Sequence, residues 1–442
     1  MILQIVFFMS RFILCLCYTR KETAMNNPHT LTETIDELVY AAVFSDDENE
    51  KKAARAHIRD IATQQGILPS SIHPLYMAFG TKEVSGFTVP AINIRTLTYD
   101  TARIIFRLMI DKKIGPVIFE IARSEIEYTE QKPDEYSVCI LAAAIKEGYK
   151  GPVFIQGDHF QLSKNKFSLN RQEEIEKIKT LAHDAIAAQF YNIDIDASTL
   201  VDLEKDTLSE QQRNNYEVTA ELTTYVRSLQ PENILISVGG EIGHIGGRNS
   251  TPSDFEAFME GYTALIKKDG ISKVSVQTGS SHGGTALPDG TIADVKLDFS
   301  VLREITEIAQ NKYQIGGSVQ HGASTLPQEF FDKFPKEKTL EIHLATGFQN
   351  IVYNTMPEAL REEIYEWLIS DKKKEWEEGW TEEQFLYKTR KKAFGPFKKR
   401  LWDLNEVQKK PIHDALRTQL LFLFEKLNVV GTKEIIEKYF AP

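Results

Sequence analysis

The sequence predicts an α/β fold, a (β/α)8 barrel with helical extensions at its N- and C-terminal ends. From about residue 86, short apolar runs that end in polar or glycine-rich segments alternate with helix-like segments. The predicted strands are 89–94, 116–122, 152–158, 190–196, 234–243, 273–279, 313–322 and 340–351. Eight strands alternating with helices over roughly 270 residues have the size and rhythm of such a barrel. A doubly wound open sheet is the competing fold, but neither GxxxxGK[ST] nor GxGxxG after a first strand supports it.

The composition indicates a globular protein of 442 residues, of which 42% are hydrophobic and 26% are charged. A net charge of −11 argues against a broad basic surface for nucleic acid, and it leaves room for a local cationic pocket. The three cysteines, Cys15, Cys17 and Cys139, are too few for a disulfide framework. We therefore expect a reducing, cytoplasmic location.

The ends of the chain differ in character from its centre. The first 18 residues are apolar, but Arg11 interrupts them, and a signal or anchor is the alternative to a mis-annotated start or disordered leader at 1–24. We expect an N-terminal helical extension at 25–85, the barrel at 86–356 and a C-terminal helical extension at 357–442. The C-terminal part contains the basic run KTRKKAFGPFKKR (388–400), which favours a solvated helix face or a subunit contact over nucleic acid.

Acidic residues and histidines stand at the predicted strand ends, which share one cleft in a parallel barrel. The third strand ends in Asp158-His159, the fourth in Asp194 to Ser198, the fifth in Glu241 to His244, the sixth in Ser281 to Gly284 and the seventh in His321 to Ser324. Three imidazoles, from His159, His282 and His321, can hold a catalytic Zn²⁺ and leave one position open, with Glu241 as an alternative oxygen ligand. A lone histidine would favour a core or capping role, whereas three at one barrel end favour the metal.

Glycine-rich segments follow two of these histidines. HGGT (282–285) and HGAST (321–325) place small residues where backbone N–H groups can point at an anion. Such turns often serve only tight backbone geometry. Next to candidate metal ligands, they predict a phosphate site.

The ordered set of motifs resembles the class II, metal-dependent ketose-bisphosphate aldolases, such as the fructose-bisphosphate and tagatose-bisphosphate aldolases. The matching segments, in chain order, are VPAIN, GDH, IDAS, GGEIGHIGG, TGSSHGG, VQHGAST and FQNIVYNT. They span roughly residues 86–356. Seven motifs in family order make the resemblance specific.

The resemblance implies a role for each matching residue. Asp158 would donate a proton to the aldehyde oxygen during condensation and remove it from the hydroxyl during cleavage, without a Schiff-base lysine. His159, His282 and His321 would hold Zn²⁺. Asp196 matches a motif in which some members hold a second cation, and a monovalent cation, Na⁺ or K⁺, is also allowed. The implied substrate and phosphate ligands are Asn93, Ser198, Gly283, Gly322, Ala323, Ser324 and Asn350.

The sequence departs from the family pattern in two places. After GHIGG, Arg248-Asn249 replaces an acidic pair, so the loop carboxylate of some members is absent. At the eighth strand the pattern is close to K-x-N-x-D-T, and Gln349 and Val352 stand where the lysine and aspartate are expected. Glu120, Arg123 and Ser124 could supply compensating polar contacts, and a salt-bridged strand-end cluster is the alternative.

The resemblance therefore predicts a lyase of carbohydrate metabolism and glycolysis that cleaves fructose 1,6-bisphosphate to dihydroxyacetone phosphate and glyceraldehyde 3-phosphate. An aldolase for tagatose 1,6-bisphosphate or another phosphorylated ketose is the nearest alternative. A non-catalytic barrel subunit is a further one, although Asp158 and the three histidines argue against it. A barrel metallohydrolase is disfavoured because the first strand, AINIR, lacks H-x-H. We expect a phosphorylated sugar substrate, no nucleic acid, no membrane, and a homo-oligomer, a dimer or larger.

Overall fold

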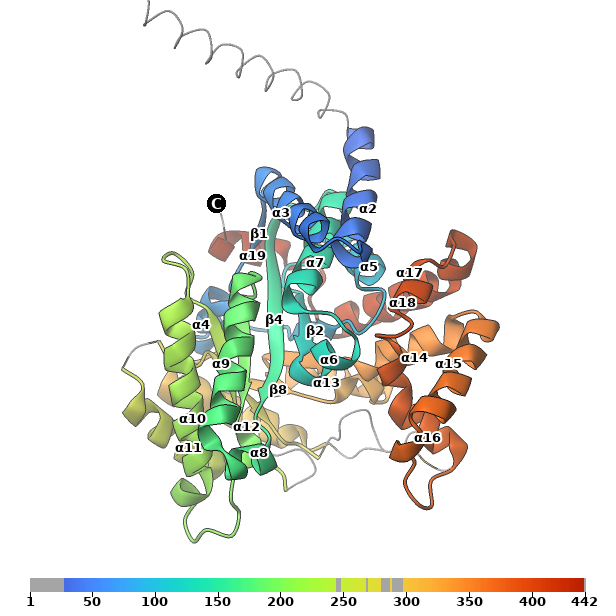
Figure 1. Ribbon diagram of the computed structural model, residues 1–442. Helices are drawn as coiled ribbons and strands as arrows, with labels where there is room; N and C mark the ends of the chain where they lie inside the picture. Colours follow the sequence, from blue (N-terminus) through green and yellow to red (C-terminus); the bar gives the residue numbers. More distant parts are fainter. Residues whose placement is uncertain (1–27, 244–247, 268, 280–286, 288–296, 441–442) are drawn as a thin grey trace, which may run out of the picture.

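A closed barrel of parallel strands forms the centre of the molecule in the computed structural model, which describes residues 28–243, 248–267, 269–279, 287 and 297–440 (Figure 1). The barrel strands are β2 (Val89–Asn93), β3 (Ile118–Ala122), β4 (Gly151–Gln161), β5 (Asn192–Asp196), β6 (Ser237–Glu241), β7 (Lys273–Val276), β8 (Ser318–Gln320) and β9 (Glu341–Leu344). Each pairs in parallel with the next, and β9 pairs with β2. The predicted (β/α)8 barrel is confirmed.

Two features of the sheet differ from the prediction. A short strand, β1 (Ile67–Pro69), pairs with the beginning of β4 outside the barrel and was not predicted. The predicted strand 340–351 is wrong in its second half, because β9 ends at Leu344 and helix α14 (Thr346–Thr355) follows. Phe348 and Val352 in this segment are both buried, and their spacing of four residues places them on one face of a helix.

Helices connect the strands around the outside of the barrel. They are α5 (Thr98–Asp111), α6 (Arg123–Tyr128), α7 (Pro133–Glu147), α8 (Lys164–Leu169), α9 (Arg171–Ala187), α10 (Leu208–Leu229), α11 (Pro252–Leu265), α12 (Phe299–Ile308) and α13 (Lys333–Lys336). Shorter turns of helix are η1 (Ser198–Leu200), the π-helical η2 (Ala309–Tyr313), η3 (Ala323–Thr325) and η4 (Gln328–Phe330).

The amino ends of the strands are covered by α4 (His73–Gly80) and the residues before it. The Ile72 amide donates to Asn192 Oδ1 at 2.8 Å, and the Ser237 amide donates to Ser71 Oγ at 2.9 Å. Asn192 and Ser237 are the first residues of β5 and β6. Two further helices, α2 (Pro28–Phe44) and α3 (Glu48–Gln64), pack beside α7. The opposite, carboxyl end of the barrel is therefore the place to look for a site.

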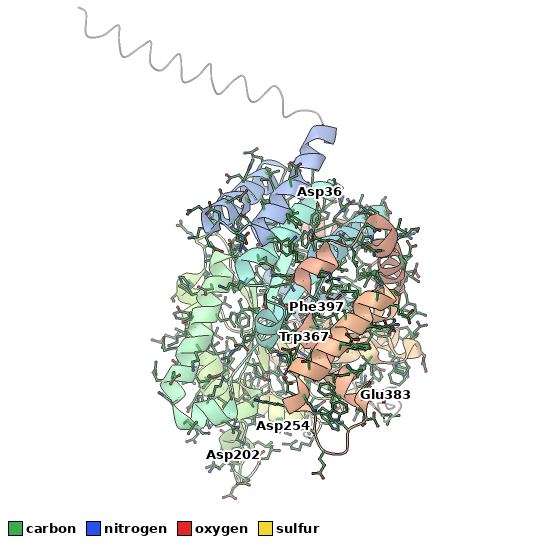
Figure 2. The ribbon with its side chains drawn as sticks, turned by 45° about the vertical axis from the view of Figure 1, so that its right-hand side comes forward. Asp36, Asp202, Asp254, Trp367, Glu383 and Phe397 are labelled. Atoms are coloured by element: carbon green, nitrogen blue, oxygen red, sulfur yellow. The ribbon has the colours of Figure 1, made fainter. Side chains whose placement is uncertain are left out.

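Most of the C-terminal helices lie on one side of the barrel, whereas the last, α19, lies apart from them and contacts α4 (Figure 1). They are α15 (Glu358–Asp371), η5 (Lys373–Glu375), α16 (Glu382–Thr389), η6 (Arg390–Ala393), α17 (Lys398–Trp402), α18 (Glu406–Lys426) and α19 (Lys433–Phe440). Trp367 and Phe397 pack edge to face, with ring centroids 5.7 Å apart (Figure 2). Lys409 of α18 binds Asp100 of α5 at 3.1 Å. The first contact packs the C-terminal helices on one another, and the second joins them to the barrel.

No helix among the described residues is both long enough and apolar enough to cross a membrane. Residues 1–24, predicted as a mis-annotated start or leader, lie outside the described part of the chain.

A buried lysine organises the interior of the barrel. Lys273 Nζ lies 2.9 Å from Asp194 Oδ2 and 2.6 Å from Glu341 Oε1, and it donates to Gln156 Oε1 at 2.7 Å. Gly239 makes room for this cluster, since a Cβ there would lie 2.4 Å from Asp194 Oδ1. Burial opposes ionisation of Lys273, but the two carboxylates outweigh it and raise the pKa of Lys273. The lysine therefore remains an ammonium ion.

We expect Lys273→Met to destabilise the fold by about 3–5 kcal/mol, because it leaves two buried carboxylates without their cation. Urea unfolding followed by circular dichroism would measure the loss. Lys338→Met is the matched control, since Lys338 is half exposed and makes one surface pair, with Glu307. Equal stability of the two variants would contradict the assigned role of Lys273.

Candidate active site

An irregularity in β4 turns two polar side chains into the mouth of the barrel. The register between β4 and β5 shifts between Gly157 and Phe160, and His159 has a positive φ of 41°. A Cβ at Gly157 would lie 2.4 Å from the Phe160 ring, so only glycine allows this ring to pack back on the strand. Bulges of this kind re-aim side chains next to functional sites. Here they bring Asp158 and His159 to the carboxyl end of the barrel.

Three potential metal ligands meet beside this bulge. The ligand atoms of His159, Glu241 and His321 all lie within 4.8 Å of one another. His159 Nδ1 is 3.2 Å from Glu241 Oε2, and the rings of His159 and His321 are 4.1 Å apart between centroids. The structure thus brings together two predicted ligands and the alternative ligand Glu241. The third predicted histidine, His282, lies outside the described residues.

Asp196, predicted as a possible ligand of a second cation, contacts His159 in the described structure. Its carboxylate lies 3.0 Å from His159 Nδ1 and accepts hydrogen bonds from Ser198 Oγ at 2.7 Å and Gln161 Nε2 at 2.5 Å. Burial opposes ionisation, but these donors outweigh it and lower the pKa of Asp196. A carboxylate on one ring nitrogen fixes the tautomer and orientation of a metal-binding histidine.

His343 is a site residue that the sequence analysis missed. Its Nδ1 lies 3.1 Å from Asp158 Oδ1 and 3.2 Å from Glu120 Oε2, and its Nε2 lies 2.5 Å from Glu341 Oε1. Its ring centroid is 4.1 Å from that of His321. Since Glu341 also binds the buried lysine, the candidate acid–base residue Asp158 is linked through His343 to the charged interior.

His343 was missed because the eighth strand was predicted to extend to residue 351, whereas β9 ends at Leu344. Gln349 and Val352, which stand where the pattern K-x-N-x-D-T has its lysine and aspartate in the sequence comparison, lie on α14, beyond the end of β9. Alternation along Glu341-Ile342-His343 was the signal that would have revealed an inward-facing histidine.

Asn350 is not brought to the site. It lies on α14, where its Oδ1 accepts from Arg390 Nη2 at 2.6 Å and its Nδ2 lies 3.4 Å from the Tyr387 hydroxyl. It does not line the cavity described next. The structure therefore does not bring Asn350 together with the other predicted substrate ligands, because the segment that carries it is a helix.

A cavity of about 540 Å³ joins these groups. Its lining includes Asn93, Asp158, His159, Ser198, Glu241, His321, Gly322, Ser324 and His343. Asn93 Oδ1 is buried and has no hydrogen-bond partner in the described part of the chain, as suits a substrate ligand. Ser324 Oγ accepts from the Gly347 amide at 3.0 Å. Ala323 is buried and does not line the cavity, and Gly283 lies outside the described residues.

Cationic side chains also reach this cavity: Arg95, Arg123, Lys166 and Lys391. Arg123 binds the Gln161 carbonyl at 2.6 Å and Glu174 Oε1 at 2.8 Å. These contacts agree with the alternative prediction, a salt-bridged cluster at the strand end. Glu120 and Ser124, its predicted companions, line the same cavity. Burial and the nearby Asp158 carboxylate raise the pKa of Glu120 well above its usual value.

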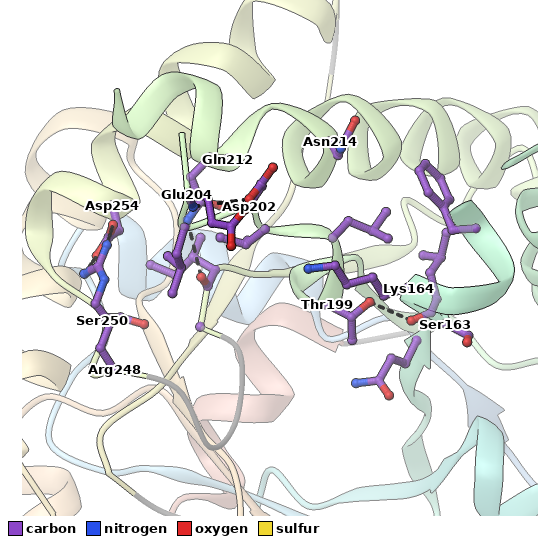
Figure 3. A pocket seen from close by; sticks show the side chains of 18 of the residues that line it. Ser163, Lys164, Thr199, Asp202, Glu204, Gln212, Asn214, Arg248, Ser250 and Asp254 are labelled. Atoms are coloured by element: carbon purple, nitrogen blue, oxygen red, sulfur yellow. Dashed lines mark hydrogen bonds and ion pairs between the residues drawn. The ribbon is translucent and has the colours of Figure 1, made fainter. Parts of the chain in front are cut away.

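A second cavity, of about 1100 Å³, adjoins the first and shares Gln161 and Thr199 with it (Figure 3). Arg248, which replaces the acidic pair of the family pattern, faces this second cavity. Its guanidinium makes two parallel hydrogen bonds to Asp254, at 2.6 and 2.7 Å. Asp254 also caps α11 through Thr251. The arginine is therefore neutralised and holds the start of α11.

The charge balance of the barrel interior favours a bound cation. Six carboxyl groups, each at most 5% exposed, face a single lysine among the described interior residues: Glu120, Asp158, Asp194, Asp196, Glu241 and Glu341. Burial, followed by repulsion from Asp196, raises the pKa of Glu241 to about 8, and burial raises that of Asp194 to about 6. Two imidazoles and a carboxylate are ligands that divalent transition metals prefer. The residues present fit such an ion.

A parallel barrel with an acid–base candidate beside a buried His–Glu–His triad defines a metal-site α/β-barrel enzyme. The sequence profile described as Fructose-bisphosphate aldolase class-II matches residues 78–402. The chain therefore belongs to the class II fructose-bisphosphate aldolase family, whose members are carbon–carbon lyases with phosphorylated sugar substrates. A comparison with curated protein sequences finds no match.

Several solved structures resemble this chain at low sequence identity, and the first of them shares its fold. The fructuronate-tagaturonate epimerase of Cohnella laeviribosi has a TM-score of 0.56 and 12% identity, covering 78% of this chain and 82% of its own. The fructose-bisphosphate aldolase of Campylobacter jejuni has a TM-score of 0.49 and 15% identity, with 83% and 97% covered. The YdjI aldolase of Escherichia coli K12 has a TM-score of 0.46 and 14% identity, with 83% and 100% covered.

We expect metal binding to be coupled to proton release. With a pKa of about 8, Glu241 is mostly protonated at neutral pH in the metal-free protein, and an ion must displace that proton. The apparent Zn²⁺ affinity should therefore fall about tenfold or more per pH unit below 8. Calorimetric titration in two buffers of different ionisation enthalpy would count the protons released. An affinity independent of pH between 6 and 8 would contradict this coupling.

Substituting Asp196→Asn should weaken Zn²⁺ binding by about 10–100-fold while the fold is retained, because His159 loses its orienting carboxylate. Competition with a chelating indicator would measure the affinity. Asp202→Asn, which changes a carboxylate in the neighbouring larger cavity, is the control and should bind as the wild type does. Unchanged binding in Asp196→Asn would show that this carboxylate does not orient the ligand.

Proposed function

We propose that the protein is a Zn²⁺-dependent aldolase that cleaves a ketose bisphosphate, with fructose 1,6-bisphosphate as substrate and dihydroxyacetone phosphate and glyceraldehyde 3-phosphate as products. The observation that carries the proposal is the position of Asp158. It shares one cavity with His159, Glu241 and His321, and its Oδ1 lies 3.9 Å from His159 Nε2. Family membership supports the same reaction class.

The candidate ligands are His159, His321 and Glu241, with His282 as the predicted further ligand. Two neutral imidazoles and one carboxylate suit Zn²⁺ and leave a coordination position for the substrate. When bound, the ion would supply Lewis-acid polarisation of the ketose carbonyl. A monovalent cation, Na⁺ or K⁺, remains a prediction from the family resemblance.

In this proposal, proton transfer belongs to Asp158. In the cleavage direction its carboxylate takes the proton of the substrate hydroxyl, and in condensation it returns that proton to the aldehyde oxygen. His343 lies 3.1 Å from Asp158 Oδ1 and holds the carboxyl group in place. Burial opposes the charged form of His343, but Glu120, Asp158 and Glu341 raise its pKa well above the usual value. A protonated His343 would favour the ionised, proton-accepting form of Asp158.

A second candidate substrate is tagatose 1,6-bisphosphate, or another phosphorylated ketose. The observation that favours it is the departure from the family pattern near the eighth strand, where Val352 stands in place of an aspartate. That aspartate helps to select the aldehyde half of the sugar, and valine cannot form the same hydrogen bond. A homo-oligomer, a dimer or larger, and a cytoplasmic location also remain predictions.

We expect the purified protein, started at Met25 and loaded with Zn²⁺, to cleave fructose 1,6-bisphosphate in a chelator-sensitive reaction. Asp158→Asn should lower kcat by at least about 10²-fold with Zn²⁺ still bound, since general acid–base catalysis contributes about 10²–10⁴-fold. A coupled assay for dihydroxyacetone phosphate and elemental analysis would measure the two properties. Asp202→Asn should retain full activity.

A panel of ketose bisphosphates would then identify the sugar. Preferred cleavage of tagatose 1,6-bisphosphate would replace the first substrate with the second. Zn²⁺ binding without cleavage of any member of the panel would favour the non-catalytic subunit. Unchanged turnover in Asp158→Asn would remove this residue from the mechanism.

A further inference from the structure

One part of the basic run 388–400 reaches the cavity. Lys391, on η6 of the C-terminal extension, lines the same cavity as the candidate metal triad. We propose that Lys391 and Arg95 together bind the anionic group, a phosphate or carboxylate, at the end of the sugar remote from the carbonyl carbon. This inference rests on the proposed function and names the residues that would select a substrate with two charged ends.

The short helix η6 is held in place from both sides. The Tyr353 hydroxyl of α14 donates to the Arg390 carbonyl at 2.6 Å, and the Gly395 amide donates to the Tyr128 carbonyl of α6 at 3.1 Å. A Cβ at Gly395 would lie 2.7 Å from that same carbonyl oxygen, so the chain packs directly on α6. Ala393 is fully buried between these contacts. Lys391 is therefore presented to the cavity by a fixed backbone.

Lys391 differs from its basic neighbours in its partners. Lys392 pairs with Glu375, and Lys398 pairs with Glu135 at 2.8 Å. In the described part of the chain, no carboxylate lies within 4.0 Å of Lys391 Nζ, which instead lies 5.6 Å from the centroid of the Tyr128 ring. Burial first, and then repulsion from Arg95, lower the pKa of Lys391. A bound anion would relieve both effects.

Arg95 provides the second cation of the pair. Its Nε donates to Glu125 Oε1 at 2.7 Å, and its Nη1 donates to Gln349 Oε1 at 2.7 Å and to Thr346 Oγ1 at 3.2 Å. The other Glu125 oxygen accepts from the Ala122 amide at 2.8 Å. Glu125 therefore pairs with Arg95, whereas Lys391 has no carboxylate within 4.0 Å among the described residues and leaves one positive charge in excess. A guanidinium and an ammonium group that line one cavity can together bind an oxyanion.

The cavity lining then combines two kinds of chemistry. The candidate metal ligands come from β4, β6 and the end of β8, and the glycine turn at Gly322 lies beside them. The cation pair comes from the end of β2 and from the C-terminal extension. A substrate whose carbonyl lies at the metal triad would have one phosphate near Gly322 and its distal anionic group at Arg95 and Lys391. Attraction between the distal anionic group and the side chains of Arg95 and Lys391 would stabilise the bound substrate and the transition state equally.

The test compares Lys391→Gln with Lys392→Gln, a matched neighbour whose charge is already paired with Glu375. With fructose 1,6-bisphosphate, Lys391→Gln should raise KM at least about tenfold and change kcat less than about threefold, as expected for loss of uniform binding. With fructose 1-phosphate, which lacks the distal anion, its KM should stay within about twofold of wild type. Lys391→Arg should restore most of the affinity, and Lys392→Gln should behave as wild type.

A ketose 1-phosphate that ends in a carboxylate separates the two anions. If Lys391→Gln raises KM more for the bisphosphate, Arg95 and Lys391 bind a phosphate. If it raises KM more for the substrate that ends in a carboxylate, they bind a carboxylate. An equal rise in the KM of Lys391→Gln for all three substrates, or no rise for any of them, would overturn the inference. If the wild type cleaves none of them, the proposed function fails, and titration with inorganic phosphate still tests the pair. Weaker phosphate binding in Lys391→Gln alone would support an anion site at Arg95 and Lys391. Equal phosphate binding in all variants would refute that site.

Discussion

The charge pairing of Lys273 inside the barrel is the interaction on which the rest of the site depends. A closed sheet forces the inward-facing side chains of every strand into one narrow space, and here many of them are carboxyl groups. Without a cation at the amino end of β7, Asp194 and Glu341 would repel each other in a low-dielectric interior. The ammonium ion allows Glu341 to stay ionised, with a pKa lowered to about 2. That carboxylate in turn holds His343.

Charged and polar contacts continue from Lys273 along the barrel axis toward the carboxyl ends of the strands. Lys273, Glu341 and His343 form a continuous chain of contacts that reaches Asp158, and the bulge in β4 sets His159 beside it. The excess of carboxyl groups among the described residues at this end favours the binding of a divalent cation. The candidate metal triad and the proton-transfer candidate lie in one buried network, so a change in one part should alter the others.

The C-terminal extension completes this arrangement from outside the barrel. Its helices pack on α5, α6 and α14, and they bring Lys391 to the rim of the cavity. In our proposal, the barrel provides the groups near the reacting carbon atoms, and Lys391 adds a positive charge for the distal end of the substrate.

The sequence by itself determined the barrel and the location of the chemistry, because strand and helix periodicity are local properties and parallel strands of a barrel end on the same side. Asp158, His159 and His321 could be named from strand-end positions alone. Only the tertiary structure revealed Lys273 and His343, since their partners lie on other strands, and it placed Asn350 on a helix outside the cavity. Long-range packing also decided that Lys391 of the basic run lines the cavity, while Lys392 and Lys398 form ion pairs elsewhere.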